Sequence, residues 1–222
     1  MTAGLAWAFG RGPRLLAPRQ IDWTMRALDT ARTSVGKLED GRVELVIEHA
    51  RLEGVTPAML HWWFQTASED MEWKGSIIPR YHVWHPVDHI QLEVVRRAAD
   101  GTVGPGSRFH IVEAFGGDLA NLVDRVVDVP RLDAGGITLE VRLLGRAIMR
   151  LAHTFTATEG GTGYHSRMLL GAESGLVMKP LSHAIRDRVL SDDKARAWLL
   201  HNVEEVGNLP HFLPSLYEAR GR

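Results

Sequence analysis

The sequence predicts an α+β domain in which a curved antiparallel sheet wraps a long C-terminal helix and leaves a cavity between them. Two observations support this prediction: strand-like runs separated by turn residues fill the middle of the chain, and a long helical run follows from Ser191 onwards. A sheet and a helix each have one apolar side, and packing them together buries both. With 222 residues and 45% hydrophobic content, the chain is large enough for one such domain with a real core.

The first part of the chain has a weak pattern that glycines and prolines interrupt. We expect residues 1–40 to form a loosely structured N-terminal arm or small subdomain, with a short helix near residues 23–31. Residues 41–222 then form the main domain. Because such an arm can pack on the body or on another subunit, a homodimer is one option for the assembly.

The main domain begins with a strand, a helix and an irregular segment. Residues 43–52 favour a strand. Thr56 and Pro57 have the character of a helix cap and a first-turn proline, so a helix is expected to begin there. The segment between Pro79 and Pro86 is rich in histidine and aromatic residues. Because each proline pushes its predecessor towards extended geometry, we expect a loop or an edge strand in this segment.

The second half of the main domain continues the sheet and ends in the helix. A turn-like stretch at residues 100–106 separates two of the strand-like runs and predicts a hairpin. Ser191 caps the final helix, and Pro210 and Pro214 are expected to end or kink it. The strand-like runs cover residues 90–98, 109–115, 137–153 and 164–172.

Composition narrows the classes of function. The 26 Lys and Arg residues nearly balance the 27 Asp and Glu residues, which leaves a formal charge of -1 and no electrostatic reason to expect nucleic acid or an anionic membrane as partner. A small molecule is the expected partner. Cysteine is absent, so imidazoles and carboxylates are the only strong metal ligands. The N-terminus lacks an apolar run of secretory or membrane-spanning length, and a cytoplasmic location is expected.

Histidines and carboxylates in three segments suggest a metal site. His201 and Glu205 stand four residues apart, which places an imidazole and a carboxylate on one helix face. Residues 81–89 supply three histidines, and Glu113 follows in an apolar strand. Two imidazoles and two carboxylates would cancel the charge of a divalent ion, which favours burial of the whole group. Solvated surface positions remain the alternative, because each of these residue types and spacings also occurs without a metal.

Two further side chains are candidates for proton chemistry. Tyr81 could aim its phenol into the cavity as a hydrogen-bond donor, and a half-buried core tyrosine is the alternative. His153 closes a long apolar run and could accept or donate a proton, while a structural strand histidine is the alternative. The sequence has no phosphate loop, no dinucleotide-type glycine fingerprint and no nucleophile-elbow pentapeptide around a serine.

At these residues the chain resembles the 2,4-diacetylphloroglucinol hydrolase and phloretin hydrolase family. Members of that family use a metal to cleave the carbon-carbon bond between an acyl group and a phenolic ring. The resemblance extends in order over roughly residues 55–217. Its motifs are Tyr81-His82-Val83-Trp84-His85-Pro86-Val87-Asp88-His89, Phe109 to Glu113, and His201-Asn202-Val203-Glu204-Glu205 with Gly207-Asn208-Leu209-Pro210.

The resemblance implies a fold, a ligand set and a reaction. Residues 41–222 would form a helix-grip catalytic domain like that of the Bet v 1 and START-type binders, with a Zn²⁺ ion in its cavity. Tyr81 would contact the substrate and His153 would act as general acid or base. The reaction would be hydrolysis of a carbon-carbon bond in an acylphloroglucinol or a dihydrochalcone-like acylated phenol. The ion would be held by His89, Glu113, His201 and Glu205.

The substrate is left open by one sequence feature, and a second function is an alternative. Position 92 is Leu, where an amide side chain would suit a diacylated phenol, so the resemblance implies the metal more directly than the particular substrate. The alternative function is a non-catalytic binder of aromatic polyketides or lipids that uses the same cavity.

Overall fold

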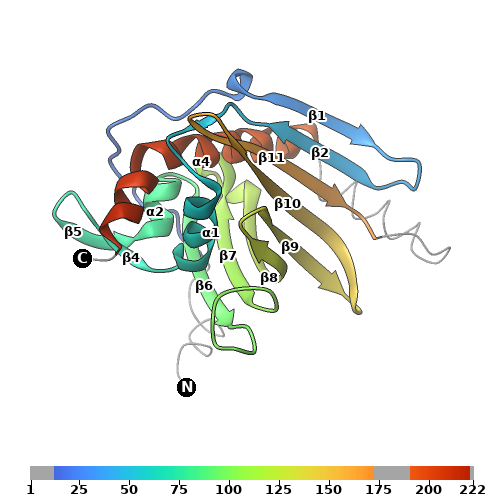
Figure 1. Cartoon of the computed structure of the whole chain (residues 1–222). Helices are drawn as coiled ribbons and strands as arrows, with labels where there is room; N and C mark the ends of the chain where they lie inside the picture. Colours follow the sequence, from blue (N-terminus) through green and yellow to red (C-terminus); the bar gives the residue numbers. More distant parts are fainter. Residues whose placement is uncertain (1–12, 173–190, 221–222) are drawn as a thin grey trace.

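A computed structural model describes residues 13–172 and 191–220 and is dominated by one antiparallel sheet (Figure 1). Its strands follow the order β1-β2-β11-β10-β9-β8-β7-β6, and the short β3 pairs with β11. The strands of this sheet are β1 (Arg32–Lys37), β2 (Val43–Glu48), β3 (Leu52–Glu53), β6 (His89–Arg96), β7 (Arg108–Ala114), β8 (Leu122–Asp133), β9 (Gly136–Leu143), β10 (Arg146–Thr158) and β11 (Gly161–Leu170). A two-stranded sheet contains β4 (Asp70–Trp73) and β5 (Ser76–Pro79).

The long helix α4 (Asp192–Ala219) lies across one face of the main sheet (Figure 1). The second half of the helix, which includes Leu209 and Leu213, packs in one core cluster with Ile137 of β9. The first half, which includes Trp198, packs in a second cluster with Leu45 of β2. The predicted antiparallel sheet around a long C-terminal helix, the helix-grip arrangement, is therefore confirmed.

Helix α4 does not end at its prolines. It continues through Pro210 and Pro214 to Ala219. A proline in a helix interior removes one backbone hydrogen bond and costs about 3 kcal/mol. Phe212 and Leu213 lie between the two prolines and are buried in the core, and the burial of each apolar side chain contributes roughly 1.5–3 kcal/mol. Packing of the apolar face therefore offsets the loss and keeps the helix intact.

The segment between Pro79 and Pro86 is a helix, so the prediction of a loop or edge strand was wrong. Pro79 is the residue before the short helix α2 (Arg80–Trp84), and Pro86 comes two residues after it. Both prolines thus lie outside the helical turn, where they do not disturb it. All four residues from Tyr81 to Trp84 are buried. The tertiary packing of this segment decides its conformation.

The N-terminal arm contributes to the main sheet. Residues 28–30 form the short 3-10 helix η2 (Leu28–Thr30), and β1 pairs along its whole length with β2. Position 40 lies in the turn between these two strands. The structure therefore shows that part of the predicted arm is an edge strand of the sheet, while residues 1–12 lie outside the described part of the chain.

Most other predicted elements are confirmed. Thr56 caps α1 (Pro57–Thr66) through a hydrogen bond from the Met59 backbone N–H. β6 and β7 form the predicted hairpin. The run at residues 137–153 is two strands, because Leu144 (φ 50°) and Gly145 (φ 78°) form a tight turn. Strand β8 was not anticipated. None of the described helices combines the length and hydropathy of a membrane-spanning helix.

Candidate metal centre

Four side chains from three segments meet where α4 passes the adjoining ends of β6 and β7. His89 opens β6 and stands opposite Glu113 of β7 in the strand register. His201 and Glu205 point from one face of α4 towards this pair, as their distances show. His89 Nε2 lies 3.6 Å from Glu113 Oε1 and 3.5 Å from Glu205 Oε2. His201 Nε2 lies 3.7 Å from Glu113 Oε2 and 3.9 Å from Glu205 Oε2.

These separations suit one shared ion. Tetrahedral Zn²⁺ with ligand bonds of about 2.0–2.1 Å has neighbouring ligand atoms about 3.4 Å apart. The observed values of 3.5–3.9 Å are slightly longer than that. The structure thus brings together all four residues that the sequence pointed to, and these buried groups could hold a metal ion.

Hydrogen bonds orient both imidazoles towards the common centre. His89 Nδ1 lies 2.8 Å from the Tyr81 carbonyl oxygen, and His201 Nδ1 lies 2.9 Å from Asp88 Oδ2. A carbonyl or carboxylate oxygen only accepts, so each Nδ1 bears the hydrogen and each Nε2 faces inwards. His89 Nε2 is buried and has no hydrogen-bond partner. An unpartnered buried imidazole nitrogen aimed at two carboxylates has the geometry of a metal ligand.

Burial and mutual charge strongly perturb these groups. Burial holds the pKa of His89 well below its usual value, so this ring is neutral. Burial raises the pKa of Glu205 to about 8, since it outweighs the attraction of His201, and the charge of Glu113 adds to the rise. Burial opposes the charged form of His201, but the Asp88 hydrogen bond and the two glutamates outweigh it and raise its pKa to about 9. Without a cation, the centre therefore retains protons at neutral pH.

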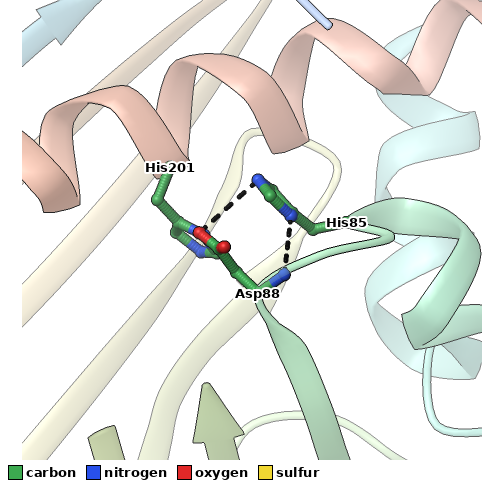
Figure 2. A group of neighbouring side chains, drawn as sticks. All are labelled: His85, Asp88 and His201. Atoms are coloured by element: carbon green, nitrogen blue, oxygen red, sulfur yellow. Dashed lines mark hydrogen bonds and ion pairs between the residues drawn. The ribbon is translucent and has the colours of Figure 1, made fainter. Parts of the chain in front are cut away.

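A second group, of His85, Asp88 and His201, adjoins the centre (Figure 2). The Asp88 backbone N–H donates to His85 Nδ1 over 3.1 Å, so the ring hydrogen is on Nε2, which donates to Glu204 Oε2 over 3.1 Å. Asp88 accepts from His201 through Oδ2, and from the Gly117 N–H through Oδ1 over 2.9 Å. Each of these atoms already has a partner, and through the hydrogen bond from His201 to Asp88 the group orients a histidine of the first centre.

Tyr81 contacts two of the four converging side chains. Its ring stacks on His89 with centroids 3.7 Å apart and an interplanar angle of 7°. Its hydroxyl donates to Glu113 Oε1. Burial, together with the charge of Glu113, raises the pKa of Tyr81 well above its usual value. The phenol therefore stays neutral and can act as a hydrogen-bond donor.

His153 lies apart from the four converging side chains. It is on β10, and among the described residues no hydrogen bond, ion pair or ring contact joins it to them. His153 Nδ1 lies 2.8 Å from Ser166 Oγ, and the ring is flanked by Phe64 and Tyr164. Burial lowers the pKa of His153 to about 3, so the ring is neutral.

Tyr164 is a polar side chain that the sequence analysis did not single out. Its hydroxyl is buried and has no hydrogen-bond partner. Burial and then the charge of Glu205 raise its pKa well above the usual value. Tyr164, Ser166 and Met168 alternate along β11 as buried residues on its inner face. That period-two pattern was the signal available in the sequence.

A hollow of about 290 Å³ reaches His201 from outside. It lies between the first turns of α4 and the loop of two short 3-10 helices, η3 (Phe115–Gly117) and η4 (Leu119–Asn121). A cavity enclosed between the sheet and α4 stays a prediction. The lining residues of the hollow are Phe115, Gly116, Asp118, Asn121, Asp193, Arg196, Ala197, Leu200, His201 and Glu204.

Comparison with known proteins identifies a family. A family model described as DAPG hydrolase PhiG domain matches residues 28–218, a range that contains all four converging side chains. No curated protein sequence matches the chain.

Several solved structures are similar to the chain. They include ginseng major latex-like protein 151 from Panax ginseng (13% identity over 76% of this chain and 99% of that one, TM-score 0.44). A START superfamily protein from Mycobacterium smegmatis is 10% identical over 73% of this chain and 98% of that one (TM-score 0.40). A protein from Rhodobacter sphaeroides is 14% identical over 83% and 99% (TM-score 0.46).

Asp88 orients His201, so replacing its carboxylate should weaken metal binding. For Asp88→Asn we expect the Kd for zinc to rise about 10–100-fold, because partners that orient a ligating histidine typically contribute that much. Competition with a chromophoric chelator measures the Kd. The matched control is Asp100→Asn, which changes an exposed carboxylate in the turn at the far end of β6. Equal affinity in both variants would contradict the assigned role of Asp88.

The retained protons predict a pH dependence of metal binding. In the metal-free protein at pH 7, Glu205 and His201 both hold a proton, because their pKa values are raised to about 8 and about 9. An ion requires both groups deprotonated, so binding at pH 7 should release about two protons. The affinity for zinc should therefore rise with pH until about pH 9 and then level off. Calorimetry in buffers of different ionisation enthalpy counts the protons, and pH-independent affinity would refute this assignment.

Proposed function

Since the chain belongs to the DAPG hydrolase PhiG domain family, we propose that it is a zinc-dependent hydrolase that cleaves the carbon-carbon bond between an acyl group and a phenolic ring. An acylphloroglucinol or a dihydrochalcone-like acylated phenol is the proposed substrate. The observation that carries the proposal is that the Nε2 atoms of His89 and His201 each lie 3.5–3.9 Å from an oxygen of Glu113 and from an oxygen of Glu205.

The donor set fits zinc. Once His201 and Glu205 have lost their protons, the centre offers two imidazole nitrogens and two carboxylates, and the chain has no thiolate. Nitrogen and oxygen ligands in fourfold arrangement are typical of zinc, and the two carboxylates cancel its charge. His89, Glu113, His201 and Glu205 would hold the ion. When bound, zinc would polarise a substrate oxygen as a Lewis acid.

The proposed reaction needs proton transfer at two places. Water adds its OH to the acyl carbon while the ring carbon gains a hydrogen, so the products are a carboxylic acid and the deacylated phenol. The pair of electrons from the broken bond stays on the ring carbon, which must therefore be protonated. Two neutral groups suit this chemistry: Tyr81, beside the centre, can donate through its hydroxyl, and His153, on β10 apart from the four converging side chains, can accept or donate a proton.

Two side chains in or against the core suit an aromatic ligand with hydroxyl groups. The unpartnered hydroxyl of Tyr164 could hydrogen-bond a phenol or a carbonyl oxygen. Leu92 of β6 is half-buried and packs against the apolar core, so it offers the ligand an apolar contact and no hydrogen bond. A ligand with fewer polar substituents than a diacylated phenol would suit that apolar contact.

Metal content and acid release test the proposal together. The purified protein should hold about one zinc per chain and release a carboxylic acid from at least one member of a panel of acylphloroglucinols and dihydrochalcones. His201→Ala and Glu205→Gln should each lose the metal and lower turnover by more than about 100-fold. Glu93→Gln is the matched control, because Glu93 is an exposed carboxylate on β6. Elemental analysis and acid titration provide the readouts.

Two results would contradict the proposed function. A folded protein that contains no metal after purification and after incubation with zinc would indicate the non-catalytic binder of aromatic polyketides or lipids. A zinc-loaded protein that releases no acid from any acylphenol of the panel would show that the metal has another role.

A further inference from the structure

A buried carboxylate and three arginines gather on the outer face of the sheet, the face away from α4. Glu140 of β9 stands opposite Arg150 of β10 in the strand register, and Arg142 follows Glu140 by two residues on the same face. His153 stands opposite Ser166, whose side chain is on the inner face. Arg150 precedes His153 by three residues on the regular part of β10, so the two side chains point to opposite faces. The arginines therefore point away from the metal centre.

Glu140 holds two of the guanidinium groups in place. Its side chain is only 1% exposed. Arg142 donates to Oε2 from Nε over 2.9 Å and from Nη2 over 2.6 Å. Arg150 donates to Oε1 from Nε over 2.8 Å and from Nη2 over 2.7 Å. These four donors fill the acceptor sites of the carboxylate, so Glu140 has no capacity left for a third guanidinium group.

Arg146, the third arginine, has no carboxylate partner. It is exposed at the start of β10, and no carboxylate among the described residues lies within ion-pair distance of its guanidinium group. A bulge between Ala147 and Met149 shifts the register of β10, so Ala147, opposite Arg142, shares the outer face with Arg150. The bulge thus brings the start of β10 to the same side as the paired arginines.

The group has an excess of positive charge. Three guanidinium groups face the single carboxylate of Glu140, which leaves two positive charges without compensation. Other carboxylates near this face do not cancel them, because each is paired with an arginine outside the group. These pairs are Asp40 with Arg42, Glu44 with Arg167, and Asp128 with Arg108.

A hollow of about 330 Å³ lies over the three arginines. A cavity of this size is typical of sites for small molecules. Leu169 of β11 also lines the hollow, and it is a buried residue that stands opposite Arg150 in the strand register. Ala147 lines it as well. The hollow therefore combines guanidinium groups with an apolar wall.

We propose that this hollow binds a small phosphate monoester, with the phosphate on Arg146 and Arg150 and the apolar body against Leu169. A phosphate monoester has a charge of about −1.5 to −2 at pH 7, which matches the two uncompensated positive charges. Arg150 Nη1 makes no hydrogen bond to another described residue, and Arg146 offers its whole planar fork, the geometry that suits phosphate oxygens. The inference is independent of the proposed function.

Titration of the zinc-loaded protein with three anions at constant ionic strength tests the site. Calorimetry measures the Kd, and methyl NMR of Leu169, assigned with a Leu169→Ile variant, locates the bound anion. Inorganic phosphate and phenyl phosphate should both shift the Leu169 methyl signals in a saturable way. Phenyl phosphate should bind about fivefold tighter or more, because its ring buries apolar surface. Acetate, a monoanion, should bind about tenfold more weakly than inorganic phosphate.

Arg146→Gln should raise the Kd for phenyl phosphate about tenfold, because it removes a charged hydrogen-bond donor and leaves the Glu140 pairs intact. The matched control is Arg125→Gln, which removes the same charge from an exposed arginine on β8 that does not line the hollow. Its Kd should stay within about twofold of the wild-type value. An equal rise of the Kd in both variants would show an effect of net charge alone and would overturn the site.

Three further results would contradict the proposal. Phosphate binding that leaves the Leu169 methyl signals unchanged would place the anion elsewhere, for instance at the metal centre. Equal affinity for acetate and inorganic phosphate would refute a site for a dianion. Equal affinity for inorganic phosphate and phenyl phosphate would refute the apolar wall and with it the monoester. None of these measurements depends on turnover, so they stand apart from the test of acylphenol hydrolysis.

Discussion

Two carboxylates and two imidazoles buried at one point set the main physical constraint on this molecule. Glu113 and Glu205 face the same two histidine nitrogens, and burial raises the pKa of Glu205 to about 8. Ionised carboxylates held this close together in a buried site are costly unless a cation or retained protons compensate them. A bound divalent ion would compensate both negative charges. The surrounding strands and helix α4 hold these four groups in place for such an ion.

The fold supplies the support for this centre. The β6–β7 hairpin places His89 beside Glu113, and α4 brings His201 and Glu205 against them from the other layer. Apolar packing on both halves of α4 keeps it continuous through its two prolines, so the face that presents the ligands stays aligned with the sheet. Hydrogen bonds from buried partners then set the direction of each imidazole. The strand register, the packing of α4 and the hydrogen bonds therefore all position the four converging side chains.

Local patterns predicted much of this arrangement. The spacing of His201 and Glu205 placed both on one helix face, and the apolar strand around Glu113 made this carboxylate a candidate ligand. Residues 80–84 adopt a helix because four buried side chains outweigh the extended preference of the flanking prolines, which the segment alone does not reveal. The supporting role of Asp88 and the pairing of Glu140 with Arg150 depend on contacts between different strands and helices. Such contacts have no signature in residue spacing.

X-ray absorption at the zinc edge tests the central claim most directly, because it reports the ligands around the ion itself. If two imidazoles and two carboxylates hold one ion, the spectrum of the zinc-loaded protein should show about four nitrogen or oxygen ligands at about 2.0–2.1 Å, with multiple scattering from two imidazole rings. A shell of oxygen ligands without imidazole scattering would contradict this account. It would mean that the ion binds elsewhere and that the four converging side chains have another purpose.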